Sequence, residues 1–197
     1  MNFKVKDHYF KQAKKENYVA RSIYKLEEID KKYKIFKPSD SIIDLGYFPG
    51  SWTQYASRVA PNGKIIGLDI KPVSKKLSSL KNVTLFEQDI FEVDHPCQIG
   101  LEQKVDVLLS DMAPNTTGIK SVDQDRSLNL VEKVFELAPK LLRVGGNLVI
   151  KVFDGHDAQE YLKTQKTNFE NWAYLKPKST RSVSKEFFVI GKGFKGE

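Results

Sequence analysis

Cysteine is almost absent from this chain of 197 residues, which has a single one, Cys97. One cysteine excludes a disulfide within the chain and is typical of reducing compartments, so we expect a cytoplasmic location. Long apolar runs are also missing, since none approaches the roughly 20 residues that a membrane-spanning helix needs. The first residues, Met1-Asn-Phe-Lys-Val-Lys-Asp7, lack the apolar core of a signal peptide. The sequence therefore predicts no association with a membrane.

Metal-ligand clusters and the dinucleotide fingerprint are missing as well. The three histidines, His8, His95 and His156, are isolated from one another in the sequence, so we expect no metal site. The pattern G-x-G-x-x-G, which cradles a pyrophosphate, does not occur. Without internal repeats or low-complexity tracts, the chain is expected to form one domain, 1–197, with a sizeable core.

Negative charge is scarce at both ends of the chain. Residues 1–37 carry 11 Lys and Arg against 5 Asp and Glu, and residues 176–197 carry 6 against 2. Because the whole chain has a net charge of +7, residues 38–175 have a net charge of −3. If the fold brings the ends together, they form a positive face that suits a polyanion such as RNA. The alternative is that lysine-rich helices only aid solubility. We expect residues 1–37 to be a basic helical extension of the domain.

What the sequence does have is an alternation of strand-like and helix-like segments. The predicted strands are 41–46, 64–69, 83–88, 105–110, 147–153, 171–176 and 186–191, and the predicted helices are 18–33, 52–59, 73–79, 122–142 and 157–168. Several strands are continuous β-branched or leucine runs, as expected for strands buried on both faces. Ser121 and Gln124 have capping-box spacing for the long helix, and Gly145-Gly146 is expected to end it.

The order of these elements predicts the fold class. Alternating strands and helices indicate an α/β fold, a mostly parallel seven-stranded sheet with helices on both faces. Only residues 177–185 join the last two strands, which is too short for a crossover helix, so the last strand should be antiparallel. This Rossmann-like architecture is that of the S-adenosylmethionine-dependent methyltransferases. Ligands then bind beyond the carboxyl ends of the strands.

The loop Asp44-Leu-Gly-Tyr-Phe-Pro-Gly-Ser-Trp52 leaves the first of these carboxyl ends. Gly46 and Gly50 allow the backbone to approach a ligand closely. Trp52 lies at the start of the next helix. We expect all three residues to contribute to a cofactor site.

The next two strands each end in an acidic residue. Asp69 can accept both hydroxyls of a ribose, and Asp89 can accept the exocyclic amine of an adenine, with Ile90 against the ring. Asp69 alone would also suit NAD, but the glycine spacing for a pyrophosphate is absent. An adenosine without phosphates, as in S-adenosylmethionine, fits better. The alternative is that Asp44, Asp69 and Asp89 only cap strands and helices.

Five motifs in order resemble one known family over about residues 7–196. They are Arg21-Ser-x-x-Tyr-Lys-Leu26, Asp44-Leu-Gly-x-x-Pro-Gly-x-Trp52, Ser110-Asp-Met-Ala-Pro-Asn115, Val149-Ile-Lys-Val-Phe153 and Ser179-x-Arg-Ser-x-Ser-x-Glu186. The family is FtsJ/RrmJ (RlmE), ribose 2′-O-methyltransferases of large-subunit ribosomal RNA. The resemblance implies S-adenosylmethionine as cofactor and a uridine of 23S-type RNA in the ribosomal particle as substrate. The chain departs from the family at Tyr47, Phe48 and Ser51, where two alanines and a glycine are usual.

The resemblance places the family's catalytic tetrad on Lys25, Asp111, Lys151 and Glu186. Lys151 also stands out by itself, because a charge inside an apolar strand is costly unless it has a partner. We expect Lys151 to act as general base on the ribose hydroxyl, and Asp111 to hold its ammonium and lie near the methyl donor. Lys25 and Glu186 would position the ribose. The alternative is that Lys151 and Glu186 form a cross-strand ion pair without chemistry.

The expected partner is RNA, with Lys176, Lys178, Arg181 and Lys185 following its phosphates. The polar segment 115–125 could close over the substrate. Other interpretations stay open: a methyltransferase of transfer or messenger RNA with the same tetrad, or a noncatalytic RNA-binding protein on this scaffold. We expect the chain to be a monomer.

Overall fold

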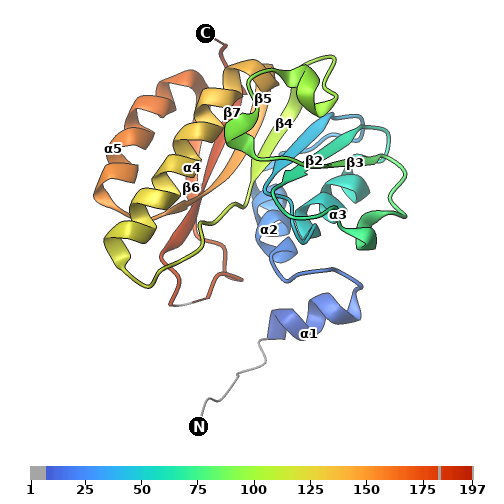
Figure 1. The fold of residues 1–197 in the computed structure, drawn as a ribbon, viewed down its shortest axis with the longest axis horizontal. Helices are drawn as coiled ribbons and strands as arrows, with labels where there is room; N and C mark the ends of the chain where they lie inside the picture. Colours follow the sequence, from blue (N-terminus) through green and yellow to red (C-terminus); the bar gives the residue numbers. More distant parts are fainter. Residues whose placement is uncertain (1–7, 182, 197) are drawn as a thin grey trace.

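A seven-stranded sheet forms the centre of the computed structural model, which describes residues 8–181 and 183–196 (Figure 1). The strands are β1 (Ile42–Leu45), β2 (Ile65–Asp69), β3 (Val83–Glu87), β4 (Val105–Ser110), β5 (Leu142–Phe153), β6 (Phe169–Leu175) and β7 (Glu186–Phe194). Their spatial order is β3-β2-β1-β4-β5-β7-β6. β1 to β5 pair in parallel, and β7 runs antiparallel to β5 and β6. The predicted mixed sheet with a reversed last strand is therefore confirmed.

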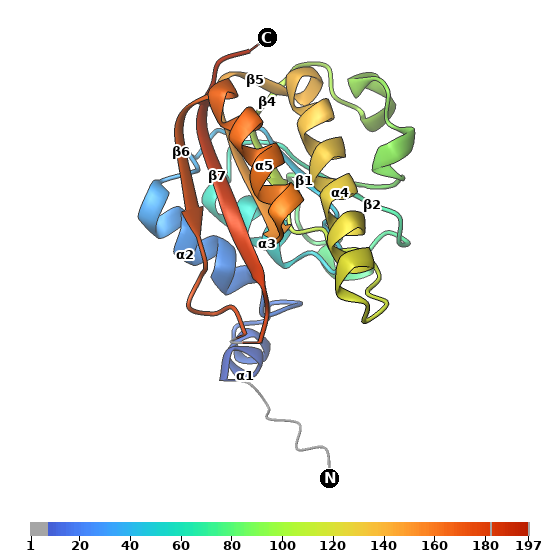
Figure 2. The same cartoon turned by 90° about the vertical axis from the view of Figure 1, so that its left-hand side faces the viewer.

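Helices cover both faces of this sheet. They are α1 (His8–Lys15), α2 (Ile23–Tyr33), α3 (Ser51–Val59), α4 (Lys120–Leu141) and α5 (His156–Gln165), with the 3-10 turns η1 (Lys75–Leu77), η2 (Ile90–Glu92), η3 (Pro96–Ile99) and η4 (Lys166–Asn168). Figure 2 shows α4 and α5 on one side of the sheet and α2 and α3 on the other. No helix in the described ranges is long and apolar enough to span a membrane.

Successive side chains of the central strands feed two separate cores, because they point to opposite faces of the sheet. On β5, Leu148 packs in the core under α4 and α5 with Val134. Its neighbour Val149 packs in the core under α2 and α3 with Leu26. Burial on both faces explains why these strands read as continuous apolar runs.

The N-terminal segment contains two helices where the sequence predicts one helix over 18–33. α1 ends at Lys15, and Asn17 then adopts a left-handed conformation with φ of 60°, which breaks the helical path. α2 begins only at Ile23, and its apolar residues Ile23, Leu26 and Ile29 are buried. The first part of the expected basic extension, residues 1–7, lies outside the described residues.

Three local predictions were wrong. The segment 73–79 forms only the short turn η1. At the start of α4 the Ser121 capping box is absent. Instead, Asp123 Oδ1 accepts a hydrogen bond from the Thr117 amide at 2.7 Å and anchors the preceding loop to the helix. Gly145-Gly146 does not end α4, because the chain passes directly into β5 at Leu142 and both glycines lie where the pairing register of β5 shifts.

Parts of the two basic regions meet, because α2 lies beside β6 and β7 (Figure 2). Arg21 donates a hydrogen bond to the carbonyl of Ser179, between β6 and β7. The amide of Lys178 donates to Glu28 Oε2 on α2 at 2.9 Å. The expectation that the fold brings the ends together is therefore confirmed.

Candidate functional site

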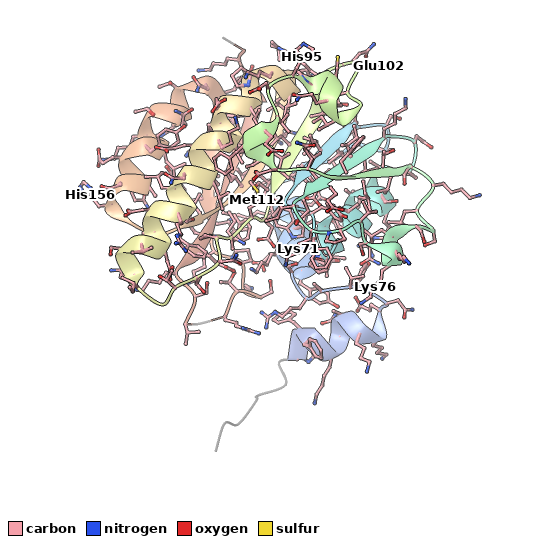
Figure 3. The ribbon with its side chains drawn as sticks, in the orientation of Figure 1. Lys71, Lys76, His95, Glu102, Met112 and His156 are labelled. Carbon is pink, nitrogen blue, oxygen red and sulfur yellow. The ribbon has the colours of Figure 1, made fainter. Side chains whose placement is uncertain are left out.

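A cavity of about 510 Å³ opens at the carboxyl ends of β1 to β4, and we call it the strand-end cavity. Its lining includes Gly46, Phe48, Asp69, Ile70, Lys71, Asp89, Ile90, Phe91, Asp111, Met112, Asn115 and Arg126. Figure 3 labels two of these residues, Met112 and Lys71, near the centre of the view. Five of the seven residues expected to hold a cofactor lie here: Gly46, Asp69, Asp89, Ile90 and Asp111.

Asp69 joins two of the loops around this cavity. Its Oδ2 accepts a hydrogen bond from the amide of Phe48 at 3.0 Å, and its Oδ1 accepts one from the amide of Lys71 at 2.9 Å. The Lys71 ammonium lies 4.8 Å from the centre of the Phe48 ring, within the range of a cation–π contact. The carboxylate therefore holds a wall of the cavity in place, and each of its oxygens keeps a further acceptor position.

Asp89 and Ile90 form the neighbouring wall. The Asp89 carboxylate accepts a hydrogen bond from the amide of Phe91 at 2.9 Å, which fixes the turn η2 after β3. Ile90 is buried and still reaches the cavity lining. Asp89 therefore does cap a helical turn, as the alternative of purely capping residues expected, and its side chain also lines the cavity.

The absence of a side chain at Gly46 makes room for the side chain of Met112. Gly46 has φ of 74°, and a Cβ there would overlap the Met112 side chain. Met112 follows Asp111 on the loop after β4 and lines the cavity. The motif Ser110-Asp-Met-Ala-Pro-Asn115 was noted in the sequence, but the lining positions Met112 and Asn115 were not identified from it.

Gly50 and Trp52 are not among the lining residues. Gly50 packs against Leu77 of η1, and its φ of 111° favours glycine. Trp52 is buried, with its indole N–H donating to the carbonyl of Ser22 at 2.9 Å and its ring 5.6 Å from that of Phe188. Trp52 thus joins α3 to α2 and β7 beneath the site.

The two aromatic residues of the first loop have opposite environments. Tyr47 is only 3% exposed, and its hydroxyl accepts a hydrogen bond from the amide of Ser74 at 3.2 Å. Phe48 is 40% exposed and lines the strand-end cavity. Ser51, the third departure from the family pattern, is buried with its hydroxyl 2.7 Å from that of Ser22.

Lys151 and Asp111 form a buried ion pair next to this cavity. The Lys151 ammonium lies 3.1 Å from Asp111 Oδ1 and also donates to the Asp111 carbonyl. The Lys151 side chain is only 8% exposed. Its place on β5 is on the face that carries Val149, opposite Phe188 of β7. The charge inside the apolar strand therefore has the partner that its burial requires.

Lys25 and Glu186 form a second ion pair, with each side chain 13% exposed. The Lys25 ammonium also lies 5.6 Å from the centre of the Phe188 ring. Burial raises the pKa of Glu186, but the charge and hydrogen bond of Lys25, together with the charge of Lys151, lower it below its ordinary value overall. Glu186 is therefore an anion between two cations, and the four residues of the expected tetrad are electrostatically coupled.

The pairing register of β5 and β7 shows that Lys151 and Glu186 are not directly opposite each other. Glu186 lies opposite Phe153, whereas Lys151 lies opposite Phe188. The side chain of Glu186 pairs with Lys25 of α2 instead of Lys151. The alternative of a direct Lys151–Glu186 ion pair is therefore wrong.

Asp44 is an acidic residue beneath the site, and the sequence analysis did not assign it to the site. It is 1% exposed, and its Oδ2 accepts a hydrogen bond from the Thr53 hydroxyl at 2.7 Å, while its buried Oδ1 has no partner among the described residues. Burial, opposed by the Thr53 hydrogen bond and assisted by the charges of Asp111 and Asp69, raises the pKa of Asp44 to about 7. The sequence signal that could have identified Asp44 is its position as the first residue of the motif Asp44-Leu-Gly-x-x-Pro-Gly-x-Trp52.

A second cavity, of about 710 Å³, lies on the other side of the tetrad, and we call it the acceptor cavity. It is lined by Arg21, Ser22, Lys25, Thr116, Arg181, Val183, Ser184 and Glu186. The loop after Asp111 runs between the two cavities, with Asn115 lining the first and Thr116 the second. The tetrad therefore faces one acidic cavity and one basic cavity.

No group of three or more His, Cys, Asp or Glu side chains able to hold a metal ion occurs in residues 8–181 and 183–196. Figure 3 shows His95 and His156 at separate places on the edge of the molecule. The partly enclosed lysines and carboxylates of the site can bind cations, orient a hydroxyl and exchange its proton.

Comparison with known families places this chain among methyltransferases. A model described as FtsJ-like methyltransferase matches residues 18–194. The ribosomal RNA large subunit methyltransferase E of Bdellovibrio bacteriovorus is 42% identical over 97% of this chain and 98% of its own length. The protein of the same name in Oleidesulfovibrio alaskensis is 44% identical over 98% of this chain and 94% of its own length.

Solved structures agree with this relationship. A chain described as a ribosomal RNA methyltransferase of Plasmodium falciparum superposes with a TM-score of 0.79 at 28% identity, over 91% of this chain and all of that one. The fibrillarin pre-rRNA processing protein of Methanococcus jannaschii superposes with a TM-score of 0.62 over 82% of this chain and 69% of its own. At 18% identity, the second similarity supports the fold alone.

Proposed function

This chain belongs to the FtsJ-like methyltransferase family, and from this premise we propose that it methylates the ribose 2′-hydroxyl of a uridine in large-subunit ribosomal RNA. The names of its relatives support ribosomal RNA as substrate. The observation that carries the ribose chemistry is the pairing of Lys151 with Asp111 and of Lys25 with Glu186 between two cavities. These pairs bring together residues from α2, β5, β7 and the end of β4.

The strand-end cavity suits S-adenosylmethionine in size and in charge. Its volume of about 510 Å³ falls in the range of small-molecule sites. Three carboxylates line it, Asp69, Asp89 and Asp111, against two cations, Lys71 and Arg126, and this acidic excess favours a cationic ligand over a pyrophosphate. This donor set argues against the NAD alternative.

We assign the residues of this cavity to parts of the cofactor by their chemistry. Asp69 would accept the ribose hydroxyls through the acceptor positions that its two backbone hydrogen bonds leave available. Asp89 would accept the adenine amine, with Ile90 against the ring. Gly46 permits the close approach of Met112 to the floor of the site. Gly50 and Trp52 would act indirectly, by fixing the loop and α3.

The bound cofactor would supply an electrophilic methyl group on a sulfonium ion. The chain's own residues have to orient the ribose hydroxyl and accept its proton. Lys151, in its neutral form, would accept the proton at Nζ, and Asp111 Oδ1, at 3.1 Å, would stabilise the ammonium that results. Lys25 and Glu186, which line the acceptor cavity, would hold the ribose.

The basic surface around the acceptor cavity supports RNA as the second substrate. Arg21 and Arg181 line the cavity, and the Arg21 guanidinium lies 5.5 Å from the centre of the Tyr9 ring of α1, a helix with three lysines. We therefore propose one methyltransferase domain over 1–197, with residues 1–37 as a basic extension that contacts RNA. Because the tetrad is complete within one chain, we expect it to act as a monomer.

The test is methyl transfer to defined RNAs with a labelled methyl donor. Unmodified large ribosomal subunits should accept the label at one uridine, and the labelled nucleotide should resist alkaline cleavage, because methylation removes the attacking hydroxyl. Free ribosomal RNA, transfer RNA and messenger RNA serve as comparison substrates. Label on a base would refute the ribose assignment, and a preference for transfer or messenger RNA would favour those substrates. RNA binding without transfer would favour the noncatalytic alternative.

A further inference from the structure

A third cavity, of about 620 Å³, lies between the starts of α4 and α5 and the connection from β6 to β7, and we call it the α5 cavity. Glu186 lines both the α5 cavity and the acceptor cavity. Glu186 of the tetrad therefore separates two cavities, each with space for a ligand. Nothing in the proposed chemistry uses the α5 side.

Three lysines line the α5 cavity from two directions. Lys120 comes from the start of α4, while Lys176 and Lys185 come from the two ends of the β6–β7 connection. The Lys176 ammonium donates to the carbonyl of Ser184 at 2.7 Å and so holds that connection closed. Lys120 and Lys185 are exposed, and within the described ranges neither ammonium has a hydrogen bond or ion pair. These two cations are available to a ligand.

The three lysines outnumber the two acidic residues that line the cavity, Asp154 and Glu186. Glu186 is paired with Lys25 on the acceptor side. Asp154 accepts a hydrogen bond from the Gln159 side chain at 3.1 Å, which holds it beside the start of α5. That start has Gly155 at its N-cap without a side-chain cap, so its positive end adds to the field of the lysines. The balance in the cavity is cationic.

We propose that the α5 cavity binds a phosphate of the RNA strand beside the nucleotide that is methylated, with Lys120 and Lys185 as its two cationic contacts. This inference rests on the proposed function. A ribose held at Glu186 by a continuous strand has neighbouring nucleotides on both sides, and the two cavities that share Glu186 provide those sides. Arg21 and Arg181 would contact the strand on one side and the two lysines on the other.

The test compares two double variants with the same change in net charge. Lys120→Gln/Lys185→Gln removes the proposed contacts. Lys64→Gln/Lys104→Gln removes two exposed lysines that directly precede β2 and β4, at the opposite ends of the parallel strands. Each protein is titrated with a labelled single-stranded, uridine-rich RNA oligonucleotide at several salt concentrations, and its affinity for S-adenosylmethionine is measured by calorimetry.

For Lys120→Gln/Lys185→Gln, the slope of the logarithm of the RNA association constant against the logarithm of salt concentration should be less steep by about 0.7, since one phosphate contact is lost on a single strand. The RNA KM on large ribosomal subunits should rise, while cofactor affinity and Tm stay at wild-type values. The Lys64→Gln/Lys104→Gln control should retain the wild-type slope.

Equal slopes for the two double variants would overturn this inference and leave the proposed function standing. Unchanged RNA binding with reduced methylation of ribosomal subunits would also overturn it, because the cavity would then contact a ribosomal protein. A wild-type protein that neither binds nor methylates RNA would overturn the proposed function itself and, with it, this inference.

Discussion

Replacing Lys151 tests the proposed chemistry most directly, because its ammonium meets a carboxylate between the two cavities. Lys151→Met removes the charge and keeps most of the apolar stem that packs in β5. The side chain is 8% exposed and its partner Asp111 is 18% exposed. Removing one partner of a fully buried pair costs about 3–5 kcal/mol. Because Asp111 keeps some access to water, we expect a smaller loss of stability, on the order of 2 kcal/mol.

The loss of rate should be much larger than this loss of stability suggests. A positioned general base contributes roughly 10²- to 10⁴-fold, or about 3–5 kcal/mol of the activation barrier. Lys151→Arg should be nearly as inactive, since a guanidinium stays protonated and cannot accept the hydroxyl proton.

The assay is single-turnover methyl transfer to unmodified large ribosomal subunits, with cofactor affinity and Tm measured on the same samples. The double variant Lys151→Met/Asp111→Asn is the control for folding, because it removes both charges of the pair. It should recover stability relative to Lys151→Met and remain inactive. Near wild-type turnover of Lys151→Arg would refute the general-base role and leave Lys151 as a positioning group.

Three further variants test the cofactor side of the site. Asp69→Ala should weaken S-adenosylmethionine binding roughly 10- to 100-fold, because charged hydrogen bonds of about 1.5–3 kcal/mol are lost; an unchanged calorimetric Kd would contradict the ribose assignment. Phe48→Ala should raise the cofactor KM several-fold with kcat retained, and an unaltered KM would mean that its ring does not contact the cofactor. Burial, opposed by Thr53 and assisted by nearby acids, raises the pKa of Asp44 from 3.8 to about 7, so the native state holds a proton that the unfolded chain releases. The free energy of unfolding should therefore fall by up to roughly 4 kcal/mol as pH rises from 3.8 to about 7. Chemical denaturation of the cofactor-free protein should show that Asp44→Asn stabilises the fold increasingly over the same pH range. A difference in stability between this variant and the wild type that does not change with pH would contradict the raised pKa.

The sequence predicted the strands better than the helices, for a physical reason. The seven predicted strands all form, and the signal is strongest in the central strands β1, β2 and β4, which are buried on both faces, whereas the edge strands β3 and β6 are partly exposed. The errors lie where single residues decide. Asn17 breaks the first helix by a left-handed turn, and Asp123 rather than Ser121 anchors the loop at the start of α4. Such local competition is not visible in periodicity.

The sequence predicted part of the geometry of the candidate site. Lys151 stood out because an ammonium in an apolar strand needs a partner, and the resemblance implied Asp111 as that partner, which is the pair that the structure has. The residues alone left a Lys151–Glu186 pair open, because the contact between Lys25 and Glu186 joins positions 161 residues apart. Trp52 shows the same limit, because spacing placed it at the cofactor loop while its apolar ring packs beneath the site against Phe188.

The distribution of charge along the chain explains how one site can receive two substrates of opposite charge. The middle of the chain supplies the carboxylates Asp69, Asp89 and Asp111, which line the cavity proposed for a cationic cofactor. The basic ends supply most of the cations around the other two cavities, where the proposed RNA is anionic. Lys151 and Glu186 lie between these fields with their charges paired, so the site can be enclosed before either substrate arrives. A charge placed on the wrong side would repel its substrate, so under the proposed function we expect the net charge of −3 between two basic ends to matter for activity.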